Sequence, residues 1–137
     1  MSTMNRILLF PALLLSALPA AAQAPMAAPK LNLAQETSLR CSAAFGLIAY
    51  DQKRGAPGAD AFPPLGERGR EFFVRTTARL MDETGASRET VQALLKVRVA
   101  ELQKGAMESA NPGEFTGRTV RACLPLLDAE VPAAPKR

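Results

Sequence analysis

The chain has 137 residues, 47% of them hydrophobic and 22% charged, and 17 Lys and Arg against 13 Asp and Glu give it a net charge of +4. This length suits a single domain, and the mild positive charge is not the strongly basic footprint of a nucleic-acid-binding protein. With no His, no Trp and one Tyr, the chain lacks the commonest general base and metal ligand near neutral pH, and also an aromatic platform for stacking sugars or bases.

Residues 1–22 have the pattern of a secretory signal peptide. Arg6 precedes the apolar stretch 7–18, and small residues lead up to Ala22, where we expect cleavage, with a second small-residue site ending at Ala24. The stretch is shorter than the roughly 20 apolar residues that span a bilayer. We therefore predict a periplasmic or secreted protein with no stable membrane insertion after cleavage.

The first element of the predicted domain is a helix over residues 33–53. It follows a Pro- and Ala-rich segment, residues 23–32, that is typical of a flexible leader. Within the helix, the run from Leu39 to Tyr50 is apolar or small on nearly every side. A helix of this kind must be covered on more than one side, so we expect the other helices to pack around it.

A loop over residues 54–66 follows, because its three Pro and three Gly exclude a continuous helix. Phe62 and Leu65 flank a pair of prolines in this loop. Two interpretations of these apolar side chains are open. They form an exposed segment that contacts a partner, or they fold back and cover the end of the core.

The pattern predicts a second helix over residues 67–84, with Gly85 as its C-terminal stop. Charged residues gather on one side of this helix, with opposite charges three or four positions apart, and we expect that side to face solvent. Phe72 projects from this charged side and is a candidate partner contact. The predicted buried side comprises Phe73, Thr77, Leu80, Met81 and Thr84.

Ser87 is suited to cap a third helix that continues to Glu108. Apolar residues form a stripe along it, and Arg98 falls in the middle of that stripe. A buried charge is costly unless it is paired. Arg98 is therefore expected either to pair with a carboxylate of another helix or to bind a ligand in a helical cleft.

Asn111 and Pro112 mark the start of a fourth helix, which we expect Pro125 to kink or end soon after Cys123. Residues 129–137 are predicted to be a disordered tail, which leaves a helical domain over residues 33–128. The predicted inward side of the fourth helix comprises Phe115, Thr119, Ala122, Cys123 and Leu126.

Predicted export bears on the chemical state of the two cysteines, Cys41 and Cys123. In an oxidising compartment an even number of cysteines in a small domain indicates disulfide bonding, and two cysteines allow one intramolecular pairing. We find no repeats and no pattern of paired strands. The predicted fold is therefore all-α, a small bundle of about four helices closed by one disulfide.

Motifs that carry chemistry are largely missing from this chain. Ser-Lys, Cys-His and paired-carboxylate arrangements, phosphate-binding Gly-rich loops and metal-ligand clusters are absent from the sequence. We therefore predict a protein that is not an enzyme and binds no cofactor or metal. The segment 84–91, followed by Leu94 and Leu95, resembles the turn and recognition-helix start of helix-turn-helix proteins. DNA binding is thus a remote alternative that requires the chain not to be exported.

Two stretches, Leu65 to Gly85 and Cys123 to Asp128, resemble small exported all-helical two-cysteine proteins of alphaproteobacterial type with no assigned function. In size, export and a single cross-link the chain also resembles small periplasmic acid-stress chaperones. We expect a non-enzymatic protein-interaction or chaperone-like module that acts on an envelope protein and binds no nucleic acid. The alternative is a helical module that binds a small apolar ligand.

Overall fold

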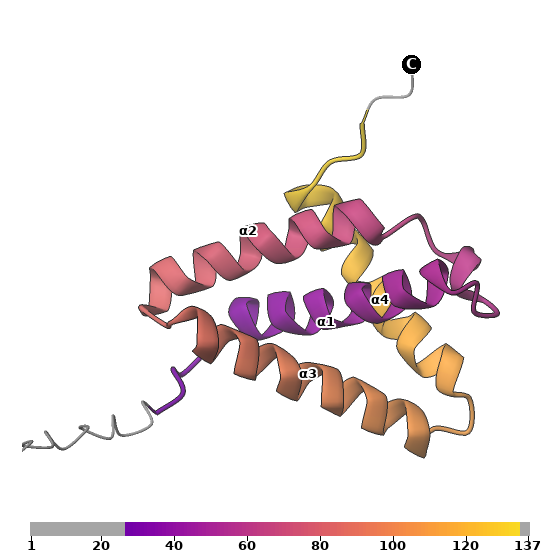
Figure 1. Ribbon diagram of the computed structural model, residues 1–137, viewed down its shortest axis with the longest axis horizontal. Coiled ribbons are helices and arrows are strands. Elements are labelled where there is room, and N and C mark those ends of the chain that lie inside the picture. Colours follow the sequence, from indigo (N-terminus) through magenta and orange to yellow (C-terminus); the bar gives the residue numbers. More distant parts are fainter. Residues whose placement is uncertain (1–26, 135–137) are drawn as a thin grey trace, which may run out of the picture.

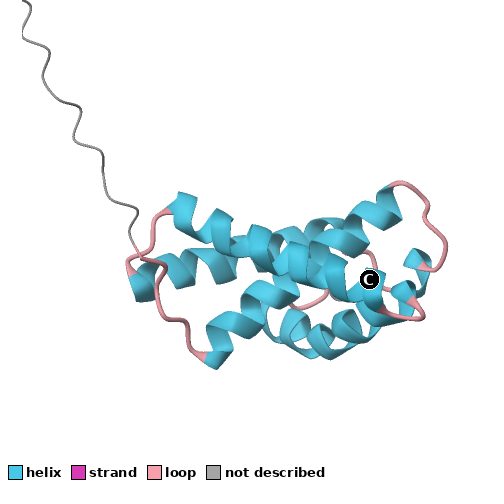
Figure 2. Ribbon diagram, turned by 90° about the horizontal axis from the view of Figure 1, so that it is seen from below, coloured by secondary structure: helices cyan, strands magenta, loops and turns pink. Residues whose placement is uncertain are grey.

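The computed structural model describes residues 27–134, and this part of the chain contains no strand (Figure 2). The predicted all-α bundle of four helices is therefore confirmed. The predicted signal peptide lies outside the described residues. The elements are α1 (Leu33–Lys53), the short 3-10 helix η1 (Ala59–Ala61), α2 (Gly66–Thr84), α3 (Arg88–Glu108) and α4 (Pro112–Glu130).

Helix α1 is the centre of the fold, as the sequence predicts. It lies between α2 and α3, and α4 crosses behind it (Figure 1). This arrangement is possible because small and apolar side chains cover most sides of α1, so that neighbours pack closely on three of them. The buried residues of α1 are Leu39, Cys41, Ser42, Ala43, Ala44, Phe45 and Ile48.

Helix α1 begins one residue after Asn32, whose side chain accepts a hydrogen bond from the backbone N–H of Gln35. The Gln35 side chain in turn accepts from the Asn32 backbone N–H, which completes a capping box. Leu31 packs against a small cluster formed by α1, α2 and α3. The last residues of the predicted leader therefore belong to the folded domain, which begins earlier than expected.

The turn between α2 and α3 contains the predicted helix stop and helix cap. Gly85 takes the left-handed conformation, with φ of 69°, and the side chain of Ser87 accepts a hydrogen bond from the Thr90 backbone N–H. This turn contains the residues that resemble a helix-turn-helix motif. From it α2 and α3 run along opposite sides of α1 (Figure 1), so the two helices contact each other mainly through the residues near the turn.

Cys41 of α1 and Cys123 of α4 form the predicted disulfide, which confirms the pairing. Their Cα atoms lie 5.5 Å apart and both residues are buried. The bond connects positions 82 residues apart in the sequence. It therefore ties the central helix to the helix that crosses behind it.

The course of α4 differs from the prediction, because the helix continues through Pro125 to Glu130. Proline removes one backbone hydrogen bond, and contacts beyond it compensate for this loss. Leu127 is completely buried in the core, whereas Leu126, predicted to point inward, is 39% exposed. The buried residues of α4 are Gly117, Val120, Cys123 and Leu127.

Arginines of α2 hold the last turn of α4. Arg68 forms an ion pair with Asp128 at 2.7 Å and donates two hydrogen bonds to the carbonyl of Val131. Arg75 donates to the Glu130 carbonyl and Arg79 pairs with the Glu130 carboxylate at 2.7 Å. Guanidinium groups near a helix C-terminus bind its free carbonyls and oppose its dipole. The charged side of α2, predicted to face solvent, therefore forms a contact with α4.

The expectation that Phe72 lies exposed on that charged side is wrong. Phe72 is 1% exposed, and its ring packs edge-to-face on that of Phe45, with centroids 5.2 Å apart. The reason is that Arg68, Arg75 and Arg79 on the same side of α2 bind the end of α4, so this side of the helix faces the protein rather than solvent. The buried face of α2 is rotated relative to the predicted one and comprises Gly69, Phe72, Thr76, Thr77 and Leu80.

The loop between α1 and α2 folds back onto the core. Leu65 is completely buried, so its interpretation as an exposed partner contact is wrong. Phe62 is half-buried against the core and lies beneath the guanidinium group of Arg121, 6.0 Å from the ring centroid. The side chain of Gln52 holds the loop in place, because its amide donates to the carbonyls of three loop residues and accepts from the Leu65 backbone N–H. The three carbonyls belong to Ala59, Phe62 and Pro63.

Candidate functional site

An open groove runs between α2 and α3 over the surface of α1. It consists of two adjoining cavities of about 220 Å³ and 340 Å³ that share Phe73. We call it the α2–α3 groove. The floor of the first cavity is formed by Ser42, Phe45, Gly46 and Ala49 of α1, whereas the second cavity lies between α2 and α3 alone. One wall of the groove is formed by Gly69, Arg70, Phe73, Val74, Thr77, Ala78 and Met81 of α2, and the other by Arg88, Val91, Gln92 and Leu95 of α3.

The groove exists because α2 and α3 diverge while α1 presents small residues between them. Gly46 lies about 140° around α1 from Cys41, so this side of α1 faces away from α4. A Cβ atom built at Gly46 would meet nothing within 4 Å, so the space above this residue is open. At Gly69, in contrast, a Cβ would come within 3.2 Å of the Cβ of Phe45. Gly69 therefore allows α2 to pack closely on α1, and Gly46 leaves open space above the surface of α1.

Most of the surface lining the groove is apolar. Phe73 is half-buried, and Val74 is 52% exposed. The hydroxyl groups nearby are satisfied internally: Thr77 donates to the Phe73 carbonyl at 2.6 Å, and Thr76, which pairs weakly with Ser42, donates to the Phe72 carbonyl at 2.8 Å. The groove therefore offers apolar contact area rather than free polar groups, the pattern of a surface that binds apolar side chains.

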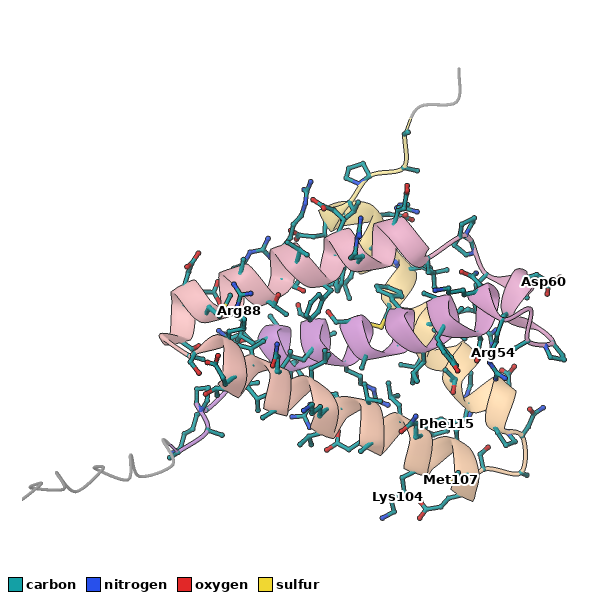
Figure 3. The ribbon with its side chains drawn as sticks, in the orientation of Figure 1. Arg54, Asp60, Arg88, Lys104, Met107 and Phe115 are labelled. Carbon is teal, nitrogen blue, oxygen red and sulfur yellow. A yellow bond between two sulfur atoms is a disulfide. The ribbon has the colours of Figure 1, made fainter. Side chains whose placement is uncertain are left out.

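Two guanidinium groups supply the charge of the groove. Arg70 lines the first cavity and Arg88 the second, and neither cavity has an acidic residue among its lining. Figure 3 places Arg88 near the end of the molecule where α2 and α3 meet. The chemistry available here is thus recognition of an apolar surface that carries negative charge.

Arg98 lies on α3 outside this groove and binds carboxylates of the protein itself. Its guanidinium group forms an ion pair with Glu36 of α1 and another with Glu101 of α3 at 2.9 Å. Burial opposes the charge of Arg98, but its hydrogen bonds to Glu101 and Glu36 outweigh that effect and raise its pKa. Arg98 therefore pairs with a carboxylate of another helix, which is the first of the two arrangements expected for it.

We predict that Arg98→Met lowers the free energy of unfolding by about 1 kcal/mol, because it keeps the packing of the side-chain stem and removes a partly buried ion pair between helices. The Arg98 side chain is 17% exposed. Lys104→Met on the same helix is the control, since Lys104 forms an exposed pair with Glu108 at 3.8 Å and should contribute little. Urea unfolding measures both. A variant as stable as the wild type, with anions raising the melting temperature of the wild type, would favour a ligand site at Arg98.

The structure does not bring the predicted contact residues together on one surface. Phe72 is in the core, and Leu65 is buried beneath the first cavity. Phe62 lines a different cavity of about 450 Å³ beside the start of α4. The groove was not predicted from the sequence, although apolar residues on two adjacent sides of α2, Phe73 and Val74, were a signal for it.

Comparison with protein-family models, with curated proteins and with solved structures finds no match for this chain. Among residues 27–134, no helix is long and apolar enough to cross a membrane. The same part of the chain has no group of three or more His, Cys, Asp or Glu side chains placed to hold a metal ion.

Proposed function

We propose that this protein is an exported, non-enzymatic interaction module, chaperone-like in character, whose α2–α3 groove binds an amphipathic helix of an envelope protein. The observation that carries this proposal is the open, mostly apolar groove between α2 and α3. Val74 is half exposed on one wall, and the floor at Gly46 is unfilled. Exposed apolar surface arranged as a groove is typical of sites that bind proteins or ligands.

The dimensions of the groove favour a helix as the occupant. Its α2 wall extends from Gly69 to Met81, about 18 Å along the helix axis, or more than three turns. Peptide helices bind in such grooves by inserting apolar residues spaced three and four positions apart. The low floor at Gly46 and Ala49 leaves room for those side chains.

Two observations support the exported location. The first 22 residues have the pattern of a signal peptide. The domain also contains a buried disulfide between Cys41 and Cys123, and such bonds persist in oxidising compartments such as the periplasm.

The test of the proposal fills the groove without disturbing the fold. Gly46→Leu introduces a side chain into open space on a helix, so we expect the melting temperature to stay the same or rise, because Gly is a poor helix former by about 1 kcal/mol relative to Ala. Gly113→Leu, in the first turn of α4 and outside the groove, is the matched control. Each variant is cross-linked in an extract of envelope proteins, and captured proteins are identified by mass spectrometry and their binding is remeasured with purified components.

We expect the wild type and Gly113→Leu to capture the same protein and Gly46→Leu to lose at least 90% of it (about tenfold weaker binding corresponds to 1.4 kcal/mol). Capture that is equal for all three proteins would refute a role for the groove. A small apolar molecule bound to the wild type and absent from Gly46→Leu in native mass spectra would instead support the ligand-binding alternative.

A further inference from the structure

We propose that the helix bound by the α2–α3 groove is acidic, with carboxylates on both sides of its apolar stripe. This inference rests on the proposed function and adds the charge of the partner to it. The groove itself supplies the argument, because its two cavities contain two arginines and no carboxylate.

Arg70 and Arg88 have no ion-pair partner among residues 27–134. Most arginines of α2 behave differently, since Arg68, Arg75 and Arg79 each pair with a carboxylate. Exposed arginines elsewhere on the domain are also unpaired, so what distinguishes these two is their position in the lining of the open groove. The unpaired positive charge is available to a partner that enters the groove.

Charged residues of both signs lie one turn beyond the lining of the groove. Lys53 follows Ala49 by four residues on α1, and Lys96 follows Gln92 by four residues on α3, so each lies one turn beyond a residue that lines the groove. Neither lysine forms an ion pair within the described part of the chain. By the same spacing the carboxylates of Asp82 and Glu89 also lie one turn from lining residues, so the excess of positive charge lies inside the two cavities themselves.

The distribution of these charges favours a helix over a fatty acid. Arg70 lines the first cavity and Arg88 the second, so two cationic positions are spread along the groove. A fatty acid has a single carboxylate at one end and satisfies one of them. A helix with several Glu or Asp beside its apolar stripe has carboxylates near both.

The experiment uses two labelled peptides of about 18 residues. Both have Leu and Ala on one helical face, and their other face carries Glu in one peptide and Lys in the other. Fluorescence polarisation measures their binding to the wild-type protein, to Arg70→Glu/Arg88→Glu and to Arg40→Glu/Arg118→Glu. The last variant has the same net charge as the first, because each replaces two arginines by glutamates. It leaves the groove unchanged, since Arg40 lies on the side of α1 opposite Ala49 and Arg118 lies on α4, and both are exposed and unpaired.

We expect the wild type to bind the Glu peptide at least tenfold more tightly than the Lys peptide, and to bind it more weakly as salt rises from about 50 mM to 300 mM. Reversing Arg70 and Arg88 should invert the preference, and reversing Arg40 and Arg118 should leave it unchanged. Equal binding of both peptides that Gly46→Leu abolishes would overturn the inference while leaving the groove as a binding site. No binding of the Glu peptide would also overturn it. Binding of a fatty acid, tested with laurate, by a wild-type protein that does not bind the Glu peptide would overturn it as well.

Discussion

Replacing both cysteines, as Cys41→Ala/Cys123→Ala, is expected to lower the free energy of unfolding by about 4 to 5 kcal/mol. The disulfide joins positions 82 residues apart, which is most of the folded domain. Such a bond restricts the unfolded chain strongly, and the loss of that restriction stabilises the unfolded state. Small domains have total stabilities of roughly 5 to 15 kcal/mol, so this single bond accounts for a large part of the total.

The place of the bond in the fold adds to the expected effect. Cys41 lies on the central helix and Cys123 on α4, which crosses behind α1 (Figure 1). Both sulfur atoms are buried in the main hydrophobic cluster. Without the bond, the packing of α4 depends on residues such as Val120 and Leu127 and on the arginines that hold its last turn.

Guanidinium chloride unfolding of the oxidised wild type and the double variant measures this effect. The control is the wild type kept in reductant, which should lose a similar amount of stability without any change of sequence. A difference of less than 1 kcal/mol between the oxidised and the cysteine-free proteins would show that the bond does not constrain the unfolded chain as argued.

The positions of the helices could be predicted from local signals. Asn111 and Ser87 cap their helices with the side-chain hydrogen bonds expected of them, and Gly85 ends α2 in the left-handed conformation. These residues act within one turn of their own position, so the sequence contains the whole interaction. The disulfide was predictable for a similar reason, because two cysteines allow a single pairing.

Features that depend on several helices at once were predicted less well. The continuation of α4 through Pro125 depends on arginines of α2 about 60 residues earlier in the chain, which bind its last carbonyls. The groove likewise depends on the divergence of α2 and α3, which no local pattern encodes. Gln52 is a third example, since its one side chain fixes a loop whose residues lie up to 13 positions away.

The orientation of α2 about its own axis shows most directly what the sequence left open. Phe72 and Phe73 are adjacent, so they point about 100° apart on the helix, and either could face the core. Charges beside Phe72 favoured Phe73 as the buried ring. The structure reverses this assignment, because those charges bind α4 rather than solvent.

Phe72→Ala is therefore expected to lower the free energy of unfolding by about 3 to 5 kcal/mol, the usual effect of removing a fully buried Phe. The loss includes the edge-to-face contact with Phe45 and leaves a cavity between α1 and α2. The matched control is Phe73→Ala, which removes the same atoms from a half-buried ring at the groove and should lower stability by about 1 kcal/mol.

Urea unfolding compares the two variants, and it is their order that decides the orientation of α2. If Phe72→Ala has no cooperative transition, the pair Phe72→Leu and Phe73→Leu makes the same comparison with a smaller change.

The two positions also differ in the function they affect. Since Phe73 lines both cavities of the groove, Phe73→Ala should weaken peptide binding beyond what its loss of about 1 kcal/mol in stability explains, whereas Phe72→Leu should weaken the fold and leave binding by the folded fraction intact. A larger loss of stability at Phe73 would mean that α2 is rotated as the charge pattern suggested, and that the groove does not have the lining described.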